Sequence, residues 1–178
     1  GMVPAATGTQ VRGSILRPAC YNGAWALKPS WGAINTRGGF PSPPSIGHLG
    51  FLAGSLADTW ISCYWLSQNA GGDAGHPSLK GEARLPKSSK PKRLARVDTA
   101  GWPDTSETVR EIFNKMIFKL ERQGVEIVSR REDPELESYE QDMLELSKVI
   151  EIILAYEYRW PLMMYADKCP ELLGDRVL

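Results

Sequence analysis

One stretch near the start of the chain organises the rest of it: Gly8-Thr9-Gln10-Val11-Arg12-Gly13-Ser14-Ile15-Leu16-Arg17-Pro18-Ala19. Glycine permits positive φ angles and a close approach of the backbone to a ligand, so the Gly13-Ser14 pair can present a hydroxyl beside exposed N–H groups. A nucleophile with donors for a developing oxyanion needs these surroundings. Taken alone, the pair also fits an ordinary turn before a strand.

Two further motifs follow this stretch in order. The first reads Cys20-x-x-Gly23-x-x-Ala26-Leu27-Lys28-Pro29-Ser30-Trp31-Gly32, and the second reads Ile46-Gly47-His48-Leu49-Gly50-Phe51-Leu52-Ala53-x-Ser55-Leu56-Ala57-Asp58. The three segments resemble the amidase signature family, whose nucleophile segment is G-T-[DQ]-T-G-G-S-[IV]-x-R-P-A. In that family C-G-V-V-G-[LF]-K-P-[TS]-[YFW]-G comes next, and D-x-[IV]-G-x-[LM]-A-R-[ST]-V-x-D opens a later helix. Ordered motifs of this length, at the family's spacing, are a specific signal.

Composition and charge narrow the class of protein. A chain of 178 residues with 42% hydrophobic residues is long enough for a sizeable core. Its 21 basic and 21 acidic residues give no net field, which disfavours a general nucleic-acid binder. Three scattered cysteines and two histidines predict neither a disulfide framework nor a zinc site. We therefore expect no metal and no cofactor.

The sequence predicts neither a membrane-spanning segment nor a surface that binds nucleic acid. No apolar run approaches the roughly 20 residues that a membrane-spanning helix needs, so we expect no membrane partner. The few, scattered cysteines favour a reducing, cytoplasmic setting. From Lys80 to Arg96 there are seven basic residues and one acid, Glu82. We interpret this run as a solvated crossover segment rather than a phosphate or nucleic-acid patch, because no aromatic residue is interleaved for base stacking.

The first half of the chain predicts short strands and one helix. Residues 24–27 read as a buried strand and residues 49–53 as a second strand. Ser55 is expected to cap a helix that Gly71-Gly72 ends, with Asp58 at the positive end of its dipole. The apolar face of this helix is expected at Leu56, Trp60, Ile61, Tyr64, Trp65 and Leu66.

The second half predicts a strand–helix–strand unit and a long helix. Residues 93–97 and 125–128 read as strands that pair in parallel, and Gly124 ends the helix between them. A capping box at Asp104 and Glu107 is expected to start that helix. Its apolar face is expected at Val109, Ile112, Phe113, Met116, Ile117 and Leu120. The long helix should start at Asp133-Pro134 and break or kink at Pro161, with a short helix over residues 170–173 behind it.

The resemblance implies the fold and its organisation. We expect an α/β fold, a partial amidase-signature α/β/α sandwich with a mixed sheet, truncated at both ends. Residues 1–79 would form the nucleophile-bearing part of the core and residues 80–92 a linker. Residues 93–178 would supply the strand–helix–strand unit and the long helices, packing on the same sheet.

The resemblance also implies roles for the opening stretch. Ser14 matches the family's nucleophile, and the N–H groups of Val11, Arg12 and Gly13, up to Ser14, match its oxyanion hole. Further support for the motif comes from Thr9, Gln10, Arg17 and Asp58. The family's partner is a small amide substrate, whose C–N bond is hydrolysed through a serine acyl-enzyme.

The general base is the part of the chemistry that the chain does not show. Serine needs a base within hydrogen-bond reach, and a lysine serves only where burial keeps it neutral. In the amidase signature family the base is a lysine relayed by a second serine, and both lie upstream of the nucleophile. No position of this sequence matches either residue. We therefore expect an internal fragment of a stand-alone amidase that is inactive by itself.

One departure from the family motif and two possible bases near the nucleophile bear on the site. Arg12 stands where the family has glycine, and we expect its long side chain to occupy the former substrate cavity. Loss of one oxyanion donor costs about 2.7–4 kcal/mol of transition-state stabilisation. Lys28 matches a structural position of the family and His48 a variable one, so neither is assigned as the base.

Two other interpretations stay open. The chain fits a non-catalytic pseudoenzyme, a small α/β body that would associate as a homodimer through surface that missing segments would otherwise cover. It also fits a remnant of the A-type subunit of a tRNA-dependent amidotransferase. The loop between Gly32 and Ser45 lacks the usual sequence of that subfamily, which favours stand-alone amidase ancestry.

Overall fold

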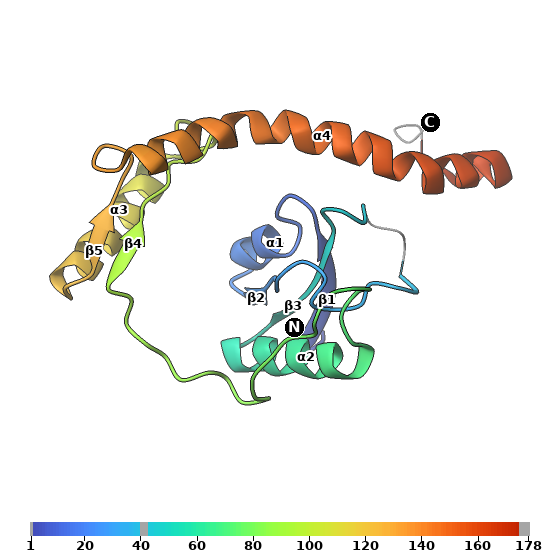
Figure 1. The fold of residues 1–178 in the computed structure, drawn as a ribbon, viewed down its shortest axis with the longest axis horizontal. Coiled ribbons are helices and arrows are strands. Elements are labelled where there is room, and N and C mark those ends of the chain that lie inside the picture. The colour runs from blue at the N-terminus through green and yellow to red at the C-terminus, as the bar shows by residue number, and fades with distance from the viewer. Residues whose placement is uncertain (1, 40–42, 175–178) are drawn as a thin grey trace. The chain divides into compact units, whose positions relative to one another are not determined.

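The computed structural model of the protein describes residues 2–39 and 43–174. The chain forms two compact units, one within Gly1–Lys87 together with Leu154–Leu178 and the other within Ser88–Ile153. Each unit combines helices with a small sheet (Figure 1), which confirms the expected α/β class.

The first unit is built on a three-stranded antiparallel sheet. Its strands are β1 (Ala5–Gln10), β2 (Trp25–Leu27) and β3 (His48–Ala53), in the spatial order β1-β3-β2. Helix α1 (Leu16–Tyr21) follows β1, and helix α2 (Leu56–Ala70) follows β3. Figure 1 shows these two helices on opposite sides of the sheet. Two of the strands were expected, whereas β1 was not.

A pair of glycines lies at the centre of the β1–β3 ladder. Gly8 is opposite Gly50 in the register of the two strands, so both belong to one face of the sheet. Ile15, at the N-terminus of α1, is fully buried against this face. A Cβ atom built on Gly50 would lie 3.0 Å from Ile15 Cδ1, and one built on Gly8 would lie 3.5 Å from Ile15 Cγ1. The missing side chains thus form a glycine notch, Gly8 and Gly50, that receives Ile15.

Helix α2 begins as expected but buries a different face. Ser55 caps it, because the Asp58 N–H donates to Ser55 Oγ at 3.0 Å. The fully buried residues of the helix are Thr59, Cys63 and Ser67, whereas Ile61 and Trp65 of the expected apolar face are 43% and 53% exposed. Small residues let the helix approach the sheet closely, and their polar groups find nearby carbonyls. Thr59 donates to the Ser55 carbonyl and Ser67 to the Ala33 carbonyl, each at 2.6 Å.

Strand β2 is not buried, contrary to expectation. Trp25 is 53% exposed, and the other two residues of the strand are half-buried. The strand lies at the edge of the three-stranded sheet, where it has one neighbouring strand instead of two. The apolar sequence of β2 is therefore not a sign that the strand is fully buried.

The second unit contains the expected parallel strand pair. Its strands β4 (Arg93–Ala95) and β5 (Glu126–Val128) pair in parallel, and α3 (Glu107–Arg122) connects them. Gly124 follows the helix with a φ of 78°, in the left-handed region that glycine favours at such a position. The predicted strand–helix–strand unit is confirmed.

Helix α3 differs from the prediction at its start and on its face. The helix begins at Glu107, directly after its N-cap residue Ser106, whose side chain makes no capping hydrogen bond. The predicted capping box at Asp104 is therefore wrong. The Asp104 N–H instead donates to the Gly101 carbonyl, which places Asp104 in a turn before the helix. The apolar face is only partly covered, because a two-stranded sheet is narrow. Its exposed members are Val109, Ile112 and Met116, and its half-buried members are Phe113, Ile117 and Leu120.

A single long helix, α4 (Pro134–Lys168), carries the chain through residues of both units. It starts where predicted, and Pro161 lies inside it without ending it. The short 3-10 helix Pro170–Leu172 follows. In the first unit Glu157 of α4 accepts hydrogen bonds from the N–H and the hydroxyl of Ser45, which lies 112 residues earlier in the sequence.

The two sheets are separate ladders in the part of the chain that the structure describes. Residues 80–92 contain no helix or strand. The division at residues 79 and 92, and the packing of residues 93–178 on the first sheet, stay predictions. None of the helices in the described residues has both the length and the apolar character needed to span a bilayer.

The glycine notch can be tested by filling it. In Gly50→Ala the new Cβ would lie 2.3 Å from the Leu27 carbonyl oxygen, so strand or side chain must shift. We expect the free energy of unfolding, measured with urea, to fall by about 1–3 kcal/mol because the site is overpacked. The control is Gly54→Ala, whose Cβ would meet no atom within 4 Å. Equal stability of the two variants would contradict the notch.

The buried face of α2 predicts unequal cysteine reactivity. Cys63 is fully buried, and burial raises the pKa of its thiol to about 11, whereas Cys20 is exposed. Because the thiolate is the reactive form, we expect a thiol reagent at pH 8 to modify Cys20 in the native chain and Cys63 only after unfolding. A variant with both Cys20→Ala and Cys169→Ala leaves Cys63 as the one thiol of the chain. Modification of native Cys63 at the rate seen in the unfolded chain would show that this face is open.

Candidate active site

Ser14 lies in the short turn between β1 and α1. Its side chain is exposed, and Gly13 before it has a φ of 128°, which an L side chain rarely adopts. The Gly13 carbonyl accepts a hydrogen bond of 2.8 Å from the Arg17 N–H, the first bond of the helical turn. The strained position is thus occupied by a residue without a Cβ, and the turn presents the serine hydroxyl at the surface of this unit.

The buried side chain of Gln10 fixes the other side of this turn. Gln10 is 7% exposed, and its Oε1 accepts hydrogen bonds from the N–H groups of Ile15 at 2.8 Å and Leu16 at 3.0 Å. These N–H groups start α1 and would otherwise have no partner within the helix. Sequence reasoning gave Gln10 only a supporting place in the motif. The structure shows that it holds the backbone directly after Ser14.

The glycine notch also holds this turn, because it receives the side chain of Ile15. Ile15 is directly bonded to Ser14 and lies in the notch with no exposed surface. The position of Ser14 is therefore set by two contacts of its neighbour, one polar through Gln10 and one apolar through Gly8 and Gly50. A signal for this arrangement exists in the sequence, since both glycines occur in the motifs.

The residues expected to form an oxyanion hole have different surroundings. Val11 and Gly13 are half-buried, whereas Arg12 is exposed. That the Arg12 side chain occupies the former substrate cavity stays a prediction. Gln10 engages the N–H groups of Ile15 and Leu16, so these two groups are not free to serve an oxyanion. The oxyanion hole at Val11, Arg12 and Gly13 stays a prediction.

Lys28 and His48 are the candidate bases that lie nearest to Ser14 in the sequence. The hydrogen bonds of their side chains are made with backbone carbonyl groups. Lys28 Nζ donates to the Pro29 carbonyl at 3.1 Å, and burial lowers the pKa of its ammonium group. His48 Nδ1 lies 3.1 Å from the Ile46 carbonyl oxygen. Burial, followed by the charge of Lys28, lowers the pKa of its ring. Both side chains are held by backbone carbonyls, as structural residues are.

The remaining motif residues do not gather around Ser14 as one cluster. Thr9 is an exposed residue of β1 opposite Leu49, and Arg17 is exposed on α1. Asp58 lies in the first turn of α2, where its Oδ2 accepts a hydrogen bond of 2.7 Å from Ser55 Oγ. Asp58 therefore stabilises the start of α2 on the other side of the sheet. Within the described ranges, no group of three or more histidine, cysteine or acidic side chains could hold a metal ion.

Comparison with known proteins decides the family. The profile of the Amidase family matches residues 1–157. The chain belongs to the Amidase family. Mandelamide hydrolase of Pseudomonas putida is 33% identical over 127 residues, which cover 71% of this chain and 22% of that protein. A glutamyl-tRNA(Gln) amidotransferase subunit from Sulfolobus acidocaldarius is 31% identical over 132 residues, covering 71% of this chain and 28% of that protein.

The fold agrees with solved members of the family. A crystal structure of an amidase superimposes with a TM-score of 0.68 at 22% sequence identity. It covers 97% of this chain, while this chain covers 35% of that structure. The chain therefore has an amidase fold over nearly its whole length and spans about a third or less of these relatives.

The capping role of Gln10 predicts a measurable change at two amides. In Gln10→Ala the N–H groups of Ile15 and Leu16 lose their acceptor, and one unsatisfied buried donor costs about 1–3 kcal/mol. We expect faster hydrogen exchange at these amides and a lower free energy of unfolding. Gln10→Glu keeps an acceptor oxygen at the same reach and should retain most of the protection. Unchanged exchange in Gln10→Ala would show that another group caps the turn.

Proposed function

We propose that this chain is the nucleophile-bearing part of an amidase and that Ser14 attacks the carbonyl carbon of a small carboxamide. The observation that carries the proposal is the exposed Ser14 directly after Gly13, in a segment that resembles the family's nucleophile motif. The turn that presents it is fixed by Gln10 and Ile15, so the hydroxyl is pre-positioned.

The reaction follows from this placement. Attack by Ser14 Oγ forms a tetrahedral oxyanion, for which we assign the N–H groups of Val11, Arg12 and Gly13, up to Ser14, as donors. The carbon–nitrogen bond then breaks, the departing nitrogen takes a proton, and an acyl-serine remains. Water attacks this ester, releases the carboxylic acid and restores the serine hydroxyl. The net reaction converts a carboxamide and water into an acid and an amine.

We propose that the base comes from outside this stretch of sequence. No residue of the chain matches the family's lysine or relay serine, and Lys28 and His48 are bonded to backbone carbonyls. A serine without a base within reach is a weak nucleophile at its ordinary pKa. On this proposal the chain by itself turns over no amide.

A second candidate rests on the similarity to the glutamyl-tRNA(Gln) amidotransferase subunit. On that proposal the same Ser14 chemistry would release ammonia from an amide within a complex of several proteins. The sequence between Gly32 and Ser45 favours a stand-alone amidase over this alternative. A non-catalytic pseudoenzyme that forms a homodimer is the remaining candidate. For the stand-alone amidase and for the pseudoenzyme, we propose a cytoplasmic protein without nucleic-acid or membrane partners.

A serine-directed fluorophosphonate probe tests the first proposal. We expect no labelling of this chain alone and labelling of a form extended upstream to include the lysine and the relay serine. The label should disappear in Ser14→Ala and persist in the matched control Ser88→Ala, which changes an exposed serine of the linker.

Two results would contradict the proposal. Turnover of a simple carboxamide by this chain alone, lost in Ser14→Ala, would show that the base lies within it. Labelling of the extended form that survives Ser14→Ala would show that another residue is the nucleophile. Mass spectrometry of the labelled peptide separates these cases.

A further inference from the structure

The linker, residues 80–92, is a part of the chain that the amidase chemistry does not use. Figure 1 shows it as a trace without helix or strand between α2 and β4. Every residue from 84 to 95 is exposed. The first segment of the first unit ends at Lys87, and the second unit begins at Ser88. Exposed connections between compact units are the preferred places for proteolytic cleavage.

The two ends of the linker are tied to folded elements, whereas its middle is not. Near the start, the indole N–H of Trp60 in α2 donates to the Glu82 carbonyl at 3.1 Å. Near the end, Lys90 Nζ donates to the Gln123 carbonyl at 2.8 Å. Between these ties, residues 83–89 make no hydrogen bond or ion pair within the part of the chain that the structure describes. A protease therefore has no internal contacts to break in this middle part.

Proline shapes the backbone of the same stretch. The ring of Pro86 holds its own φ at about −65° and keeps Leu85 before it out of the helical region. Pro91 restricts Lys90 in the same way. An extended peptide binds a protein groove through backbone hydrogen bonds, with pockets for its side chains. A segment that is already kept from forming a helix loses less entropy when a protease binds it.

Positive charge gathers on the linker and just beyond it. No acidic residue lies between Glu82 and Asp98, whereas six basic residues do: Arg84, Lys87, Lys90, Lys92, Arg93 and Arg96. A serine endoprotease that cleaves after a basic residue holds that side chain in a pocket with a carboxylate. The run of positive charge favours the approach of such an active site.

Lys87 is the basic residue with free chain on both sides. Arg84 lies two residues after Glu82, whose carbonyl is engaged by α2. Lys90 directly precedes Pro91, and a proline after the bond to be cut has no N–H and a restricted backbone. Lys87 is instead followed by two exposed serines. The bond between Lys87 and the first of these serines is therefore the most accessible lysine bond of the linker.

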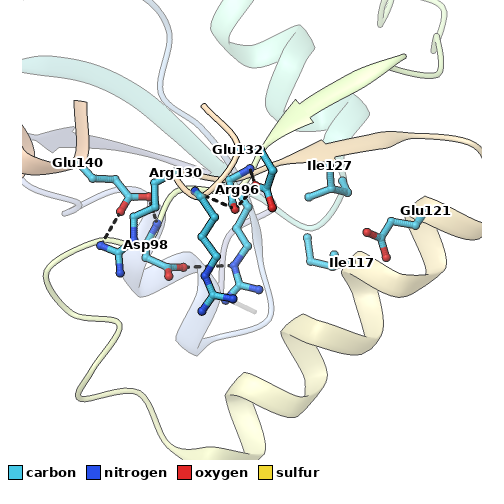
Figure 2. A pocket seen from close by; sticks show the side chains of 10 residues that line it. Arg96, Asp98, Ile117, Glu121, Ile127, Arg130, Glu132 and Glu140 are labelled. Carbon is cyan, nitrogen blue, oxygen red and sulfur yellow. Dashed lines mark hydrogen bonds and ion pairs between the residues drawn. The ribbon is translucent and has the colours of Figure 1, made fainter. Parts of the chain in front are cut away.

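The arginines at the ends of the parallel strands are held within the second unit. Arg96 Nε pairs with Asp98 Oδ1 at 3.2 Å, and Arg130 Nη1 lies 3.3 Å from Glu140 Oε2 (Figure 2). The Arg96 N–H also donates to the Val128 carbonyl at 2.7 Å. Cleavage after either arginine would first require local unfolding.

We propose that the Lys87–Ser88 bond is a processing site for a serine endoprotease that cleaves after lysine. The serine of the protease attacks the Lys87 carbonyl carbon, the bond to the Ser88 nitrogen breaks, and this nitrogen takes a proton. Water then hydrolyses the acyl-enzyme, so Lys87 ends in a carboxylate and Ser88 begins a new chain with an amino group. The product is a two-chain form in which Ser14 and Glu157 belong to different polypeptides.

Limited digestion of the full chain with a lysine-specific serine endoprotease tests the proposal. We expect the first cut, identified by mass spectrometry of the intact fragments, to fall between Lys87 and Ser88. Because residues 83–89 make no hydrogen bond with other described residues, the circular dichroism of the cut chain should equal that of the uncut chain. A first cut at any other bond, or a loss of helix signal with the first cut, would overturn the proposal.

Two variants separate the charge of Lys87 from the bond that follows it. Lys87→Gln removes the group that the protease recognises, whereas Ser88→Pro keeps it and places a proline after the bond. Each should slow cleavage at this bond at least about tenfold. The control Lys90→Gln makes the same change of charge at the exposed lysine before Pro91 and should leave the rate unchanged. Unaltered cleavage in both test variants, or an equal loss in the control, would overturn the assignment.

A further comparison shows whether the bond is open in the folded chain. A bond that becomes accessible through unfolding is cut faster when the fold is destabilised. Gly50→Ala, once urea unfolding has shown its lower stability, should be cut after Lys87 at the rate of the parent and of Gly54→Ala. Faster cleavage in Gly50→Ala would show that the first unit must unfold before the protease acts, which contradicts the proposal.

Discussion

The seating of Ile15 between Gly8 and Gly50 is the contact on which the first unit depends. It joins the opening turn, both strands of the central ladder and the start of α1 in one place. Because two opposite side chains are missing, an isoleucine can reach the backbone of the sheet itself. Ser14, the proposed nucleophile, directly precedes Ile15 in the chain, so the placement of its hydroxyl is a by-product of core packing. Gln10 adds a polar constraint on the same turn.

This arrangement explains how a small exposed turn can be well defined. A serine in an ordinary surface loop would sample many positions, and fixing it would cost conformational entropy when a substrate binds. Here the adjoining residue has no exposed surface, and the following two N–H groups share one acceptor. The entropy is lost on folding, together with the burial of an apolar side chain. The position of Ser14 is thus set by contacts of its neighbours.

Sequence reasoning recovered the features that depend on local pattern. The start of α4 at Pro134, the cap of α2 at Ser55 and the parallel pairing around α3 all follow from turn chemistry and periodicity. The family resemblance located Ser14, which composition alone could not. The prediction of which face of α2 is buried was wrong. The helix buries Thr59, Cys63 and Ser67, because close approach to the sheet favours small side chains over large ones. Other missed features depend on contacts across the sequence. The role of Gln10 depends on its side chain reaching the first N–H groups of α1, five and six residues later. Likewise, no spacing rule predicts that Glu140 of α4 accepts a hydrogen bond from the Asp98 N–H, shortly after β4.

The division of the chain has a consequence for biosynthesis. The second unit is one continuous segment, whereas the first includes residues from Leu154 onwards, which leave the ribosome after the second unit. Domains generally fold as units while the chain is being made, in order from the N-terminus. The sheet that carries Ser14 can form early, but Ser45 must wait for Glu157 before its two hydrogen bonds exist. Translation of the first unit thus begins before that of the second unit, and the first unit is completed after it.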